Sequence, residues 1–270
     1  MKKYLVCYST PDFRDSQKRL IKSALRHGID KVFAFTRKDL VKTKFYQENK
    51  CLLDKKRGGG YWLWKPYYIL EILNKIDDGD ILVYADSGVE IVADLSVLID
   101  LCIAEQGILV FDTDGHKEIE CTKHDCFILM DCDSEHYHES LQVMTTMIIF
   151  QKNQKNIEIV KKWLEYIVDE RLVSDIPSQL ALEYPEFVEN RHDQSIFSLL
   201  TKLNGIPIHR DPSQWGNYNK KEEFRVEGEF LLFPYSDTPM ENSNYGTILN
   251  HHRKRKKTFK KRIKDFFKIN

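Results

Sequence analysis

The 270-residue sequence contains no apolar run of the roughly 18 residues that a membrane-spanning helix needs, so we expect no transmembrane segment. A secretory leader is also not apparent, because the apolar run after the N-terminal lysines covers only residues 4–8 and meets polar Ser9 and Thr10. The six cysteines lack the closely paired spacing of zinc ligands and lie mostly in apolar contexts, which predicts reduced thiols. We therefore expect a cytoplasmic protein, or one on the cytoplasmic face of a membrane.

The sequence also lacks net charge, but its basic and acidic residues are unevenly distributed. Residues 253–270 hold ten Lys or Arg and one Asp, which leaves 31 basic and 40 acidic residues in the rest of the chain. Phe259, Ile263, Phe266 and Phe267 recur at helical spacing in this basic tail. The pattern is typical of a basic amphipathic helix on an anionic membrane surface. The alternatives are a solvated tail or a nucleic-acid-binding tail, and the phenylalanines make us expect no nucleic-acid partner.

Apolar runs alternate with amphipathic helical patterns in the first 115 residues, which predicts an α/β fold with parallel strands and right-handed crossovers. The strands predicted here are 3–8, 31–35, 81–84 and 107–111, and the helices between them are 17–27, 66–76 and 95–105. The pattern is less regular afterwards. There we predict a strand at 142–150, helices at 156–171 and 193–200, and short strands at 206–208 and 230–233.

Residues 57–90 concentrate the features that suggest a binding site. Gly58, Gly59 and Gly60 allow backbone angles closed to other residues, and let a ligand approach the main chain. Pro66 suits the first position of the helix that follows. Asp86 comes just after the strand at 81–84, and in open α/β sheets ligands bind outside the carboxyl ends of strands. Its carboxylate is suited to Mg²⁺ or Mn²⁺ on a diphosphate, or to a sugar hydroxyl, although a solvated turn carboxylate is the alternative.

Four sequence blocks, GGGYWLWKPYYIL, GDILVYADSGVE, CTKHDCFILMDCD and ENRHDQSIFSLL, resemble in this order those of a family of small bacterial glycosyltransferases of the GT-A fold. That family builds capsular polysaccharide and the glycans of lipopolysaccharide. The blocks span about residues 55–200. The resemblance implies transfer of a sugar, such as a hexosyl group, from a nucleotide sugar, commonly a UDP-sugar, to a glycan or lipid-linked acceptor.

The resemblance also implies a fold and a domain organisation. The expected fold is a GT-A-like, Rossmann-like α/β domain with a mixed, mostly parallel sheet flanked by helices. This domain would cover residues 1–250, with a donor half at about 1–115 and an acceptor half at about 116–250. Residues 251–270 would form the basic amphipathic tail that attaches the protein to the inner face of the cell membrane.

Carried over by position, YADSG matches the block that holds the DxD motif of related enzymes. Asp86 occupies the first Asp position, and Gly88 stands where the second would be. Because the second Asp is usually the firmer metal ligand, Mn²⁺ or Mg²⁺ would need another ligand, such as Glu90 or a late histidine, His251 or His252. The alternative is that these two histidines simply begin the tail. The residues assigned to the donor are Asp86, Ser87, Gly88, Arg57, Tyr61 and Lys65.

The RHDQS block supplies the candidate catalytic residues Asp193 and Gln194. An inverting transferase needs a carboxylate base, whereas a retaining one needs a carboxylate or amide beneath the anomeric carbon. The alternative for Asp193 is an ordinary helix N-cap. The resemblance assigns Lys123, His124, Asp125 and His192 to the acceptor or sugar pocket, for which the alternative is an ordinary loop.

Two other functions remain open at this point. One is a sugar-phosphate nucleotidyltransferase on a similar sheet, against which the absence of a glycine-rich basic loop near the first strand counts. The other is a non-catalytic adaptor that binds a membrane or nucleic acid through the basic tail.

Overall fold

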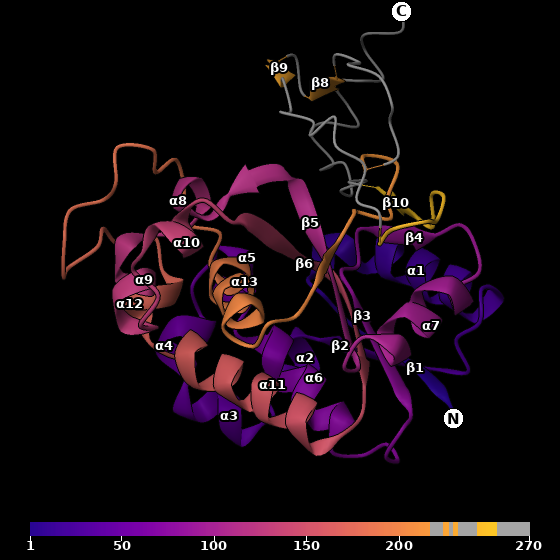
Figure 1. Cartoon of the computed structure of the whole chain (residues 1–270). Coiled ribbons are helices and arrows are strands. Elements are labelled where there is room, and N and C mark those ends of the chain that lie inside the picture. The colour runs from indigo at the N-terminus through magenta and orange to yellow at the C-terminus, as the bar shows by residue number, and fades with distance from the viewer. Residues whose placement is uncertain (217–223, 227–228, 232–241, 253–270) are drawn as a thin grey trace, which may run out of the picture.

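A six-stranded sheet lies at the centre of the computed structural model, in which residues 1–216, 224–226, 229–231 and 242–252 are described (Figure 1). Its strands are β1 (Lys3–Ser9), β2 (Lys31–Thr36), β3 (Ile81–Ala85), β5 (Ile108–Lys117), β6 (Leu141–Gln151) and β7 (Ile208–His209). Their order is β2-β1-β3-β6-β5-β7. β1 is parallel to β2 and β3, and β5 is parallel to β7, whereas β6 is antiparallel to both of its neighbours. The predicted mixed, mostly parallel sheet is therefore confirmed.

Helices cover both faces of this sheet. They are η1 (Pro11–Phe13), α1 (Arg14–Arg26), α2 (Arg37–Leu40), α3 (Lys44–Glu48), α4 (Lys50–Leu53), α5 (Gly58–Tyr61), α6 (Trp64–Leu73), α7 (Ser96–Ala104), α8 (Glu118–Cys121), α9 (His124–Leu129), α10 (Glu135–His138), α11 (Gln154–Ile167), α12 (Glu170–Val173) and α13 (Asp193–Leu203). Among the described residues, no helix is both long enough and apolar enough to cross a membrane.

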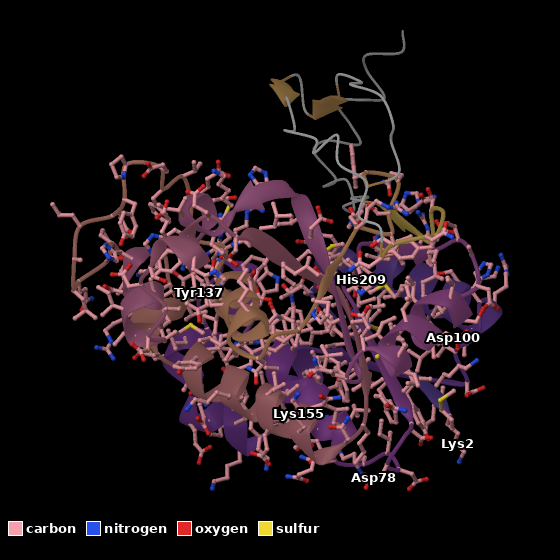
Figure 2. All side chains as sticks on the ribbon, in the orientation of Figure 1. Lys2, Asp78, Asp100, Tyr137, Lys155 and His209 are labelled. Atoms are coloured by element: carbon pink, nitrogen blue, oxygen red, sulfur yellow. The ribbon has the colours of Figure 1, made fainter. Side chains whose placement is uncertain are left out.

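The core is divided into two layers by the alternation of side chains along the strands. In β3, Leu82 and Tyr84 join the cluster formed with α6, α11 and α13, while Ile81 and Val83 join the cluster formed with α1 and α7. Side chains of both layers fill the space between helices and sheet (Figure 2). All five residues of β3 are buried, as expected of an apolar strand covered on both faces.

Two small sheets accompany the central one. β4 (Val89–Ile91) pairs antiparallel with β10 (Leu249–His251), which brings residues late in the chain beside the segment that follows β3. β8 (Phe224–Val226) pairs with β9 (Glu229–Leu231).

Several predicted boundaries were wrong by a few residues. α6 begins at Trp64, so Pro66 lies third in the helix rather than first. A proline is tolerated there because the N–H groups of the first helical turn have no partner within the helix. The helix predicted at 156–171 is two helices, α11 and α12, because Asp169 accepts a hydrogen bond from the backbone N–H of Arg171 and begins a new turn. The amphipathic helix predicted at 253–270 lies outside the described residues.

Candidate active site

Asp86 and Ser87 lie at the carboxyl edge of the parallel strands. The backbone N–H of Asp86 donates to the carbonyl of Thr146 at 2.8 Å, so the residue continues the pairing of β3 with β6. The Ser87 hydroxyl donates to the carbonyl of Tyr8, near the end of β1, at 2.6 Å. These two bonds fix the segment after β3 at the edge where open α/β sheets bind ligands.

Lys65, from the first turn of α6, lies beneath this edge with only 2% of its side chain exposed. Its Nζ is 2.6 Å from Oδ2 of Asp193 and 3.7 Å from Oδ1 of Asp86. It also donates to the hydroxyl of Thr145 at 2.9 Å and to the Thr145 carbonyl at 3.2 Å. One buried cation thus joins two carboxylates that come from separate motif blocks.

The two carboxylates lie in different environments. Asp193 is buried, and burial raises its pKa, while the charge of Lys65 and the hydroxyl of Thr145 partly offset this effect. Asp86 is one-third exposed, and its Oδ1 accepts a short hydrogen bond from the Tyr84 hydroxyl. Burial, followed by the charge of Asp86, raises the pKa of Tyr84 well above its usual value, so this phenol stays a donor. Asp86 is therefore the carboxylate accessible to a ligand, and Asp193 the one shielded from water.

Asp193 begins α13, but it is not the N-cap. His192 occupies the cap position, and the Asp193 carboxylate is directed to Lys65 and Thr145 instead. The indole N–H of Trp163 donates to the Asp193 carbonyl at 3.2 Å. The structure thus contradicts the capping alternative for this residue.

Gln194 belongs to a network of amides beside Asp193. Its Oε1 accepts from the backbone N–H of Thr145 at 3.3 Å, and its Nε2 donates to Oε1 of Gln142 at 2.7 Å. Arg191 donates to the same Gln142 oxygen at 3.2 Å. The side chain of Gln194 is therefore held against β6, next to the Lys65–Asp193 pair.

The glycine turn positions Lys65 and two aromatic residues. Gly60 has a φ of +101°, and a Cβ there would lie 2.5 Å from Cα of Leu53, so only glycine fits. Tyr61 and Trp62 also have positive φ, 49° and 59°, a conformation uncommon for residues other than glycine. Trp64 then stacks on Tyr8 with ring centroids 4.1 Å apart, which anchors the start of α6 over the end of β1.

His192 connects this aromatic turn to the segment that precedes α13. Its ring centroid is 5.3 Å from that of Tyr61 and 5.2 Å from that of Trp62. Its Nε2 is 2.8 Å from Oδ1 of Asp175. Its backbone has a φ of 58° and a ψ of −115°, a sparsely populated conformation of the kind that concentrates at functional sites.

Lys123, His124 and Asp125 hold residues 174–192 in place. Lys123 is buried and donates to the carbonyl of Ile176 at 2.6 Å. Asp125 accepts from the backbone N–H groups of Gln179 and Leu180 at about 2.9–3.0 Å. The His124 ring lies 2.6 Å from the Leu182 carbonyl and 3.1 Å from a carboxylate oxygen of Asp133. The block predicted for the acceptor pocket thus supports a loop, and its assigned role in binding stays a prediction.

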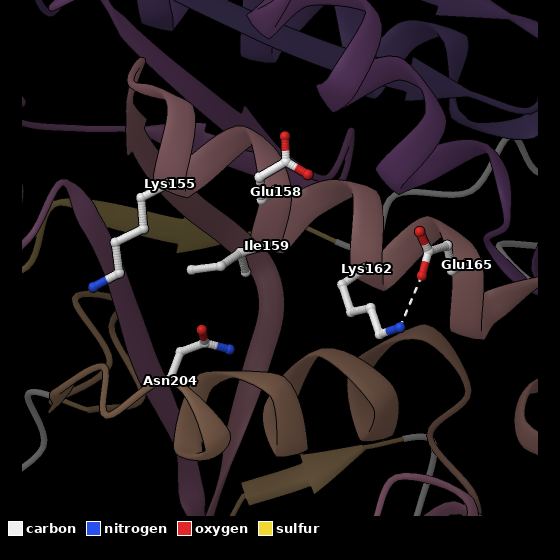
Figure 3. Close-up of a pocket in the computed structure, with 6 residues that line it drawn as sticks. All are labelled: Lys155, Glu158, Ile159, Lys162, Glu165 and Asn204. Carbon is white, nitrogen blue, oxygen red and sulfur yellow. Dashed lines mark hydrogen bonds and ion pairs between the residues drawn. The ribbon is translucent and has the colours of Figure 1, made fainter.

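A cavity of about 350 Å³ lies between this loop and the glycine turn. Arg57, predicted for the donor, and Lys123, predicted for the acceptor, both line it. A second hollow lies along α11 and is lined by Lys155, Glu158, Ile159, Lys162, Glu165 and Asn204 (Figure 3). None of the predicted site residues lines this second hollow.

The late histidines lie beside the segment that follows Asp86. The backbone N–H of His252 donates to the Gly88 carbonyl at 2.6 Å, and its Nε2 is 2.9 Å from Oε2 of Glu90. His251 pairs with Val89 in the β10–β4 sheet. In the part of the chain that is described, one group of three residues has ligand atoms close enough together to share a metal ion, namely His116, Glu120 and Cys121. Asp86 does not belong to this group. The Asp86 carboxylate is one-third exposed at the strand edge, so it is suited to be one of the one or two protein ligands of a cation that is bound mainly by diphosphate oxygens.

Sequence reasoning missed Thr145, Gln142 and Asp175, which contact the predicted residues directly. Thr145 carried a usable signal, because it interrupts the apolar run of β6. Asp175 carried none, since it lies in an irregular segment whose course is set by distant contacts.

No protein-family model matches the sequence, and no curated protein matches it. Comparison with solved structures finds mouse xyloside xylosyltransferase 1 at 8% identity and a TM-score of 0.49, covering 94% of this chain and 98% of that one. The bifunctional glycosyltransferase WbbM has 12% identity and a TM-score of 0.44, covering 74% of this chain and 37% of WbbM. GlyE of Streptococcus pneumoniae TIGR4 has 13% identity and a TM-score of 0.40, covering 78% and 46%. The chain thus spans less than half of the length of WbbM and of GlyE, and all three neighbours are glycosyltransferases.

Proposed function

We propose that this protein is a glycosyltransferase that moves a sugar, a hexosyl group, from a UDP-sugar or another nucleotide sugar to a glycan or lipid-linked acceptor in bacterial surface polysaccharide synthesis. The observation that supports it most is the convergence of Asp86 and Asp193 on Lys65. These residues come from three of the four sequence blocks that resemble the glycosyltransferase family. Donor-binding residues would come mainly from residues 1–115, and acceptor-binding residues from 116–250.

In this proposal the nucleotide lies across the carboxyl ends of β1 and β3, with Asp86 toward the ribose and a divalent cation. Mn²⁺ or Mg²⁺, when bound, would offset the charge of the diphosphate, with Asp86 and His251 or His252 as its protein ligands. Ser87 and Gly88 would contact the donor from the segment after β3, and Tyr61 would contact it from the glycine turn. The role of Lys65 is to keep Asp193 ionised in a site from which water is excluded.

Asp193 and Gln194 would act at the reaction centre. A buried carboxylate with a raised pKa is a stronger proton acceptor than an exposed one, which suits removal of a proton from the attacking hydroxyl. If the reaction instead retains configuration, the same carboxylate and the adjacent amide would stabilise positive charge beneath the anomeric carbon. The proposed residues are compatible with either outcome.

A lipid-linked acceptor is supported by apolar side chains on the loop at residues 174–192. Leu182 is 91% exposed, Val188 78% and Leu180 48%. These three residues would contact the lipid or the membrane surface close to the acceptor. Together with the basic tail, they agree with a cytoplasmic protein attached to the inner face of the membrane.

The deciding experiment is a thermal-shift panel of nucleotides and nucleotide sugars, each with and without Mn²⁺, on the full-length chain and its Asp86→Asn variant. A ligand that binds the folded state raises the melting temperature. We expect one nucleotide family to raise it, and Asp86→Asn to remove most of that rise and at least about 90% of sugar transfer. Asp78→Asn is the matched control, since that carboxylate is 86% exposed and pairs with Lys152, away from the candidate site. A panel without any shift would contradict the proposal and favour the adaptor.

A further inference from the structure

The cavity of about 350 Å³ described above has no assigned ligand. It is lined by Arg57, Lys123, Ser174, Asp175, Ile176, Pro177, Glu183, Phe187, Glu189 and Asn190. Its size lies within the range of about 300–1,000 Å³ that is typical of small-molecule sites. All of these residues except Arg57 and Lys123 belong to the loop at 174–192.

Each wall of the cavity is connected to His192, the residue that precedes Asp193. On one side, Arg57 directly precedes the glycine turn, whose Tyr61 packs on the ring of His192. On the other, Asp175 contacts Nε2 of the same His192, the residue before Asp193. A molecule in contact with Asp175 would therefore be separated by that side chain from His192, the residue before Asp193.

The loop wall is held in place by contacts within the protein. Irregular segments longer than about 12–15 residues are uncommon in compact domains and are usually functional or disordered. Residues 174–192 contain no helix or strand, yet their backbone is held by Lys123 and Asp125, and Glu183 accepts from the N–H groups of His124 and Ser178. A wall fixed in this way reduces the entropy that is lost on binding.

The lining offers groups that suit sugar hydroxyls. Asp175 and Glu189 each have one carboxylate oxygen bound to a neighbour, His192 and Arg191, and their side chains are about half exposed. This leaves the second oxygen of each able to accept from a hydroxyl. In the described part of the chain Arg57 has no side-chain partner and is available as a donor. Phe187 supplies a ring on which the C–H face of a pyranose could pack.

We propose that this cavity binds the terminal sugar of the acceptor and prefers an uncharged pyranose, an inference that rests on the proposed function. The preference follows from the carboxylate oxygens that would face the sugar. With Arg191 paired to Glu189, the three carboxylates of Asp175, Glu183 and Glu189 are balanced by three cations. The second oxygens of Asp175 and Glu189 accept hydrogen bonds from hydroxyls, but they would repel a carboxylate on the sugar at the same short range.

The test is saturation-transfer NMR on the full-length chain with the methyl glycosides of glucose, galactose, mannose and N-acetylglucosamine. Methyl glucuronide is the charged counterpart of methyl glucoside. We expect at least one neutral glycoside to bind, and the glucuronide to bind at least about tenfold more weakly than methyl glucoside. Asp175→Asn and Phe187→Ala should each weaken binding of the neutral glycoside about tenfold, and each should raise the KM for the acceptor more than the KM for the donor. Glu189→Gln, at a side chain that is half exposed and pairs with Arg191, should act in the same direction.

Glu186→Gln is the matched control, because Glu186 is exposed on the same loop and does not line the cavity. The inference is overturned if no glycoside binds, or if binding is unchanged in Asp175→Asn, Phe187→Ala and Glu189→Gln. Stabilisation by nucleotides without glycoside binding would overturn the inference alone and leave the proposed function standing. Glycoside binding that depends on Asp175, without any nucleotide effect, would support the sugar site and overturn the proposed transfer reaction.

Discussion

Lys65 is the residue on which the electrostatics of the centre depend. An ammonium group removed from water is tolerated only when it is paired and hydrogen-bonded, and here Asp193 and Thr145 supply those partners. Replacing one member of a buried pair leaves the other charge without compensation, and this typically costs about 3–5 kcal/mol. The family resemblance assigned Lys65 to the donor site, but nothing in the sequence indicated that its side chain would be buried beneath the strand end.

We therefore expect Lys65→Met to lower the free energy of unfolding by about 3–5 kcal/mol in urea titrations at pH 7.5. The loss should shrink as pH falls toward 5, because the pKa of Asp193, already raised by burial, would rise further and the protonated carboxyl needs no cation. Adding Asp193→Asn should recover part of the loss. Lys75→Met is the control, since Lys75 forms an exposed i,i+4 pair with Glu71 and should change stability by less than about 0.5 kcal/mol. An equal loss at pH 5 and pH 7.5 would contradict the electrostatic explanation.

At the scale of elements, the strands were predictable where their side chains are buried on both faces. β3 and β6 appear in the sequence as apolar runs because helices cover them, and Asp86 is recognisable because it follows such a run. The loop at 174–192 was not predictable. Its course depends on side chains of residues 123–133 that bind its backbone from about fifty residues away in the chain. Asp125, for example, accepts hydrogen bonds from the backbone N–H groups of Gln179 and Leu180. No local pattern encodes such contacts.

The attachment of this loop should depend on pH through His124 and Asp133. Burial lowers the pKa of His124, but its bonds to the Leu182 carbonyl and to Asp133 outweigh this effect and raise the value. Burial raises the pKa of Asp133, and hydrogen bonds from Tyr184, His124 and His138 outweigh it and lower the value. Stability from the raised histidine is fully present below about pH 6.5 and is lost as pH rises through its folded pKa. Stability from the lowered carboxyl is present above about pH 4 and is lost in more acidic solution.

We expect amide hydrogens of residues 178–184 to exchange more slowly at pH 5.5 than at pH 8.5, after correction for the intrinsic dependence of exchange on pH. In His124→Gln, which keeps a hydrogen-bonding side chain but does not titrate, this difference should fall by at least about half. His116→Gln is the control, because His116 binds Glu120 and does not contact the loop backbone in the described structure. If His124→Gln exchanges like the unchanged chain at both pH values, the protonation of His124 does not hold the loop.

At the scale of the whole molecule, the order of the central strands depends on pairings that no single segment specifies. The sequence supports a parallel β1–α1–β2 unit by its rhythm, but the family resemblance implied a mixed sheet without specifying that β6 lies antiparallel between β3 and β5. The same holds for the candidate site. Asp86, Lys65 and Asp193 were identifiable as motif residues, while their convergence required the fold, because α13 packs against β6 and α6 packs under β3.

The distribution of charge leads to the last prediction. The first 252 residues carry 31 basic and 40 acidic side chains, so an anionic surface repels the body of the protein and attracts residues 253–270, with ten Lys or Arg. Each basic residue near such a surface contributes about 1 kcal/mol to binding. We expect the full-length chain to bind vesicles of 30% phosphatidylglycerol in sedimentation assays, and a chain ending at residue 252 to bind them at least about 100-fold more weakly.

Neutral phosphatidylcholine vesicles and 0.5 M salt should each remove most of the binding of the full-length chain, because both weaken the electrostatic attraction. The shortened chain should keep its nucleotide-induced thermal shift, since it retains His251 and His252 and residues 253–270 contribute nothing to the proposed donor site. Equal vesicle binding by the two chains would place the membrane contact elsewhere, and Leu180, Leu182 and Val188 would then be the surface to test.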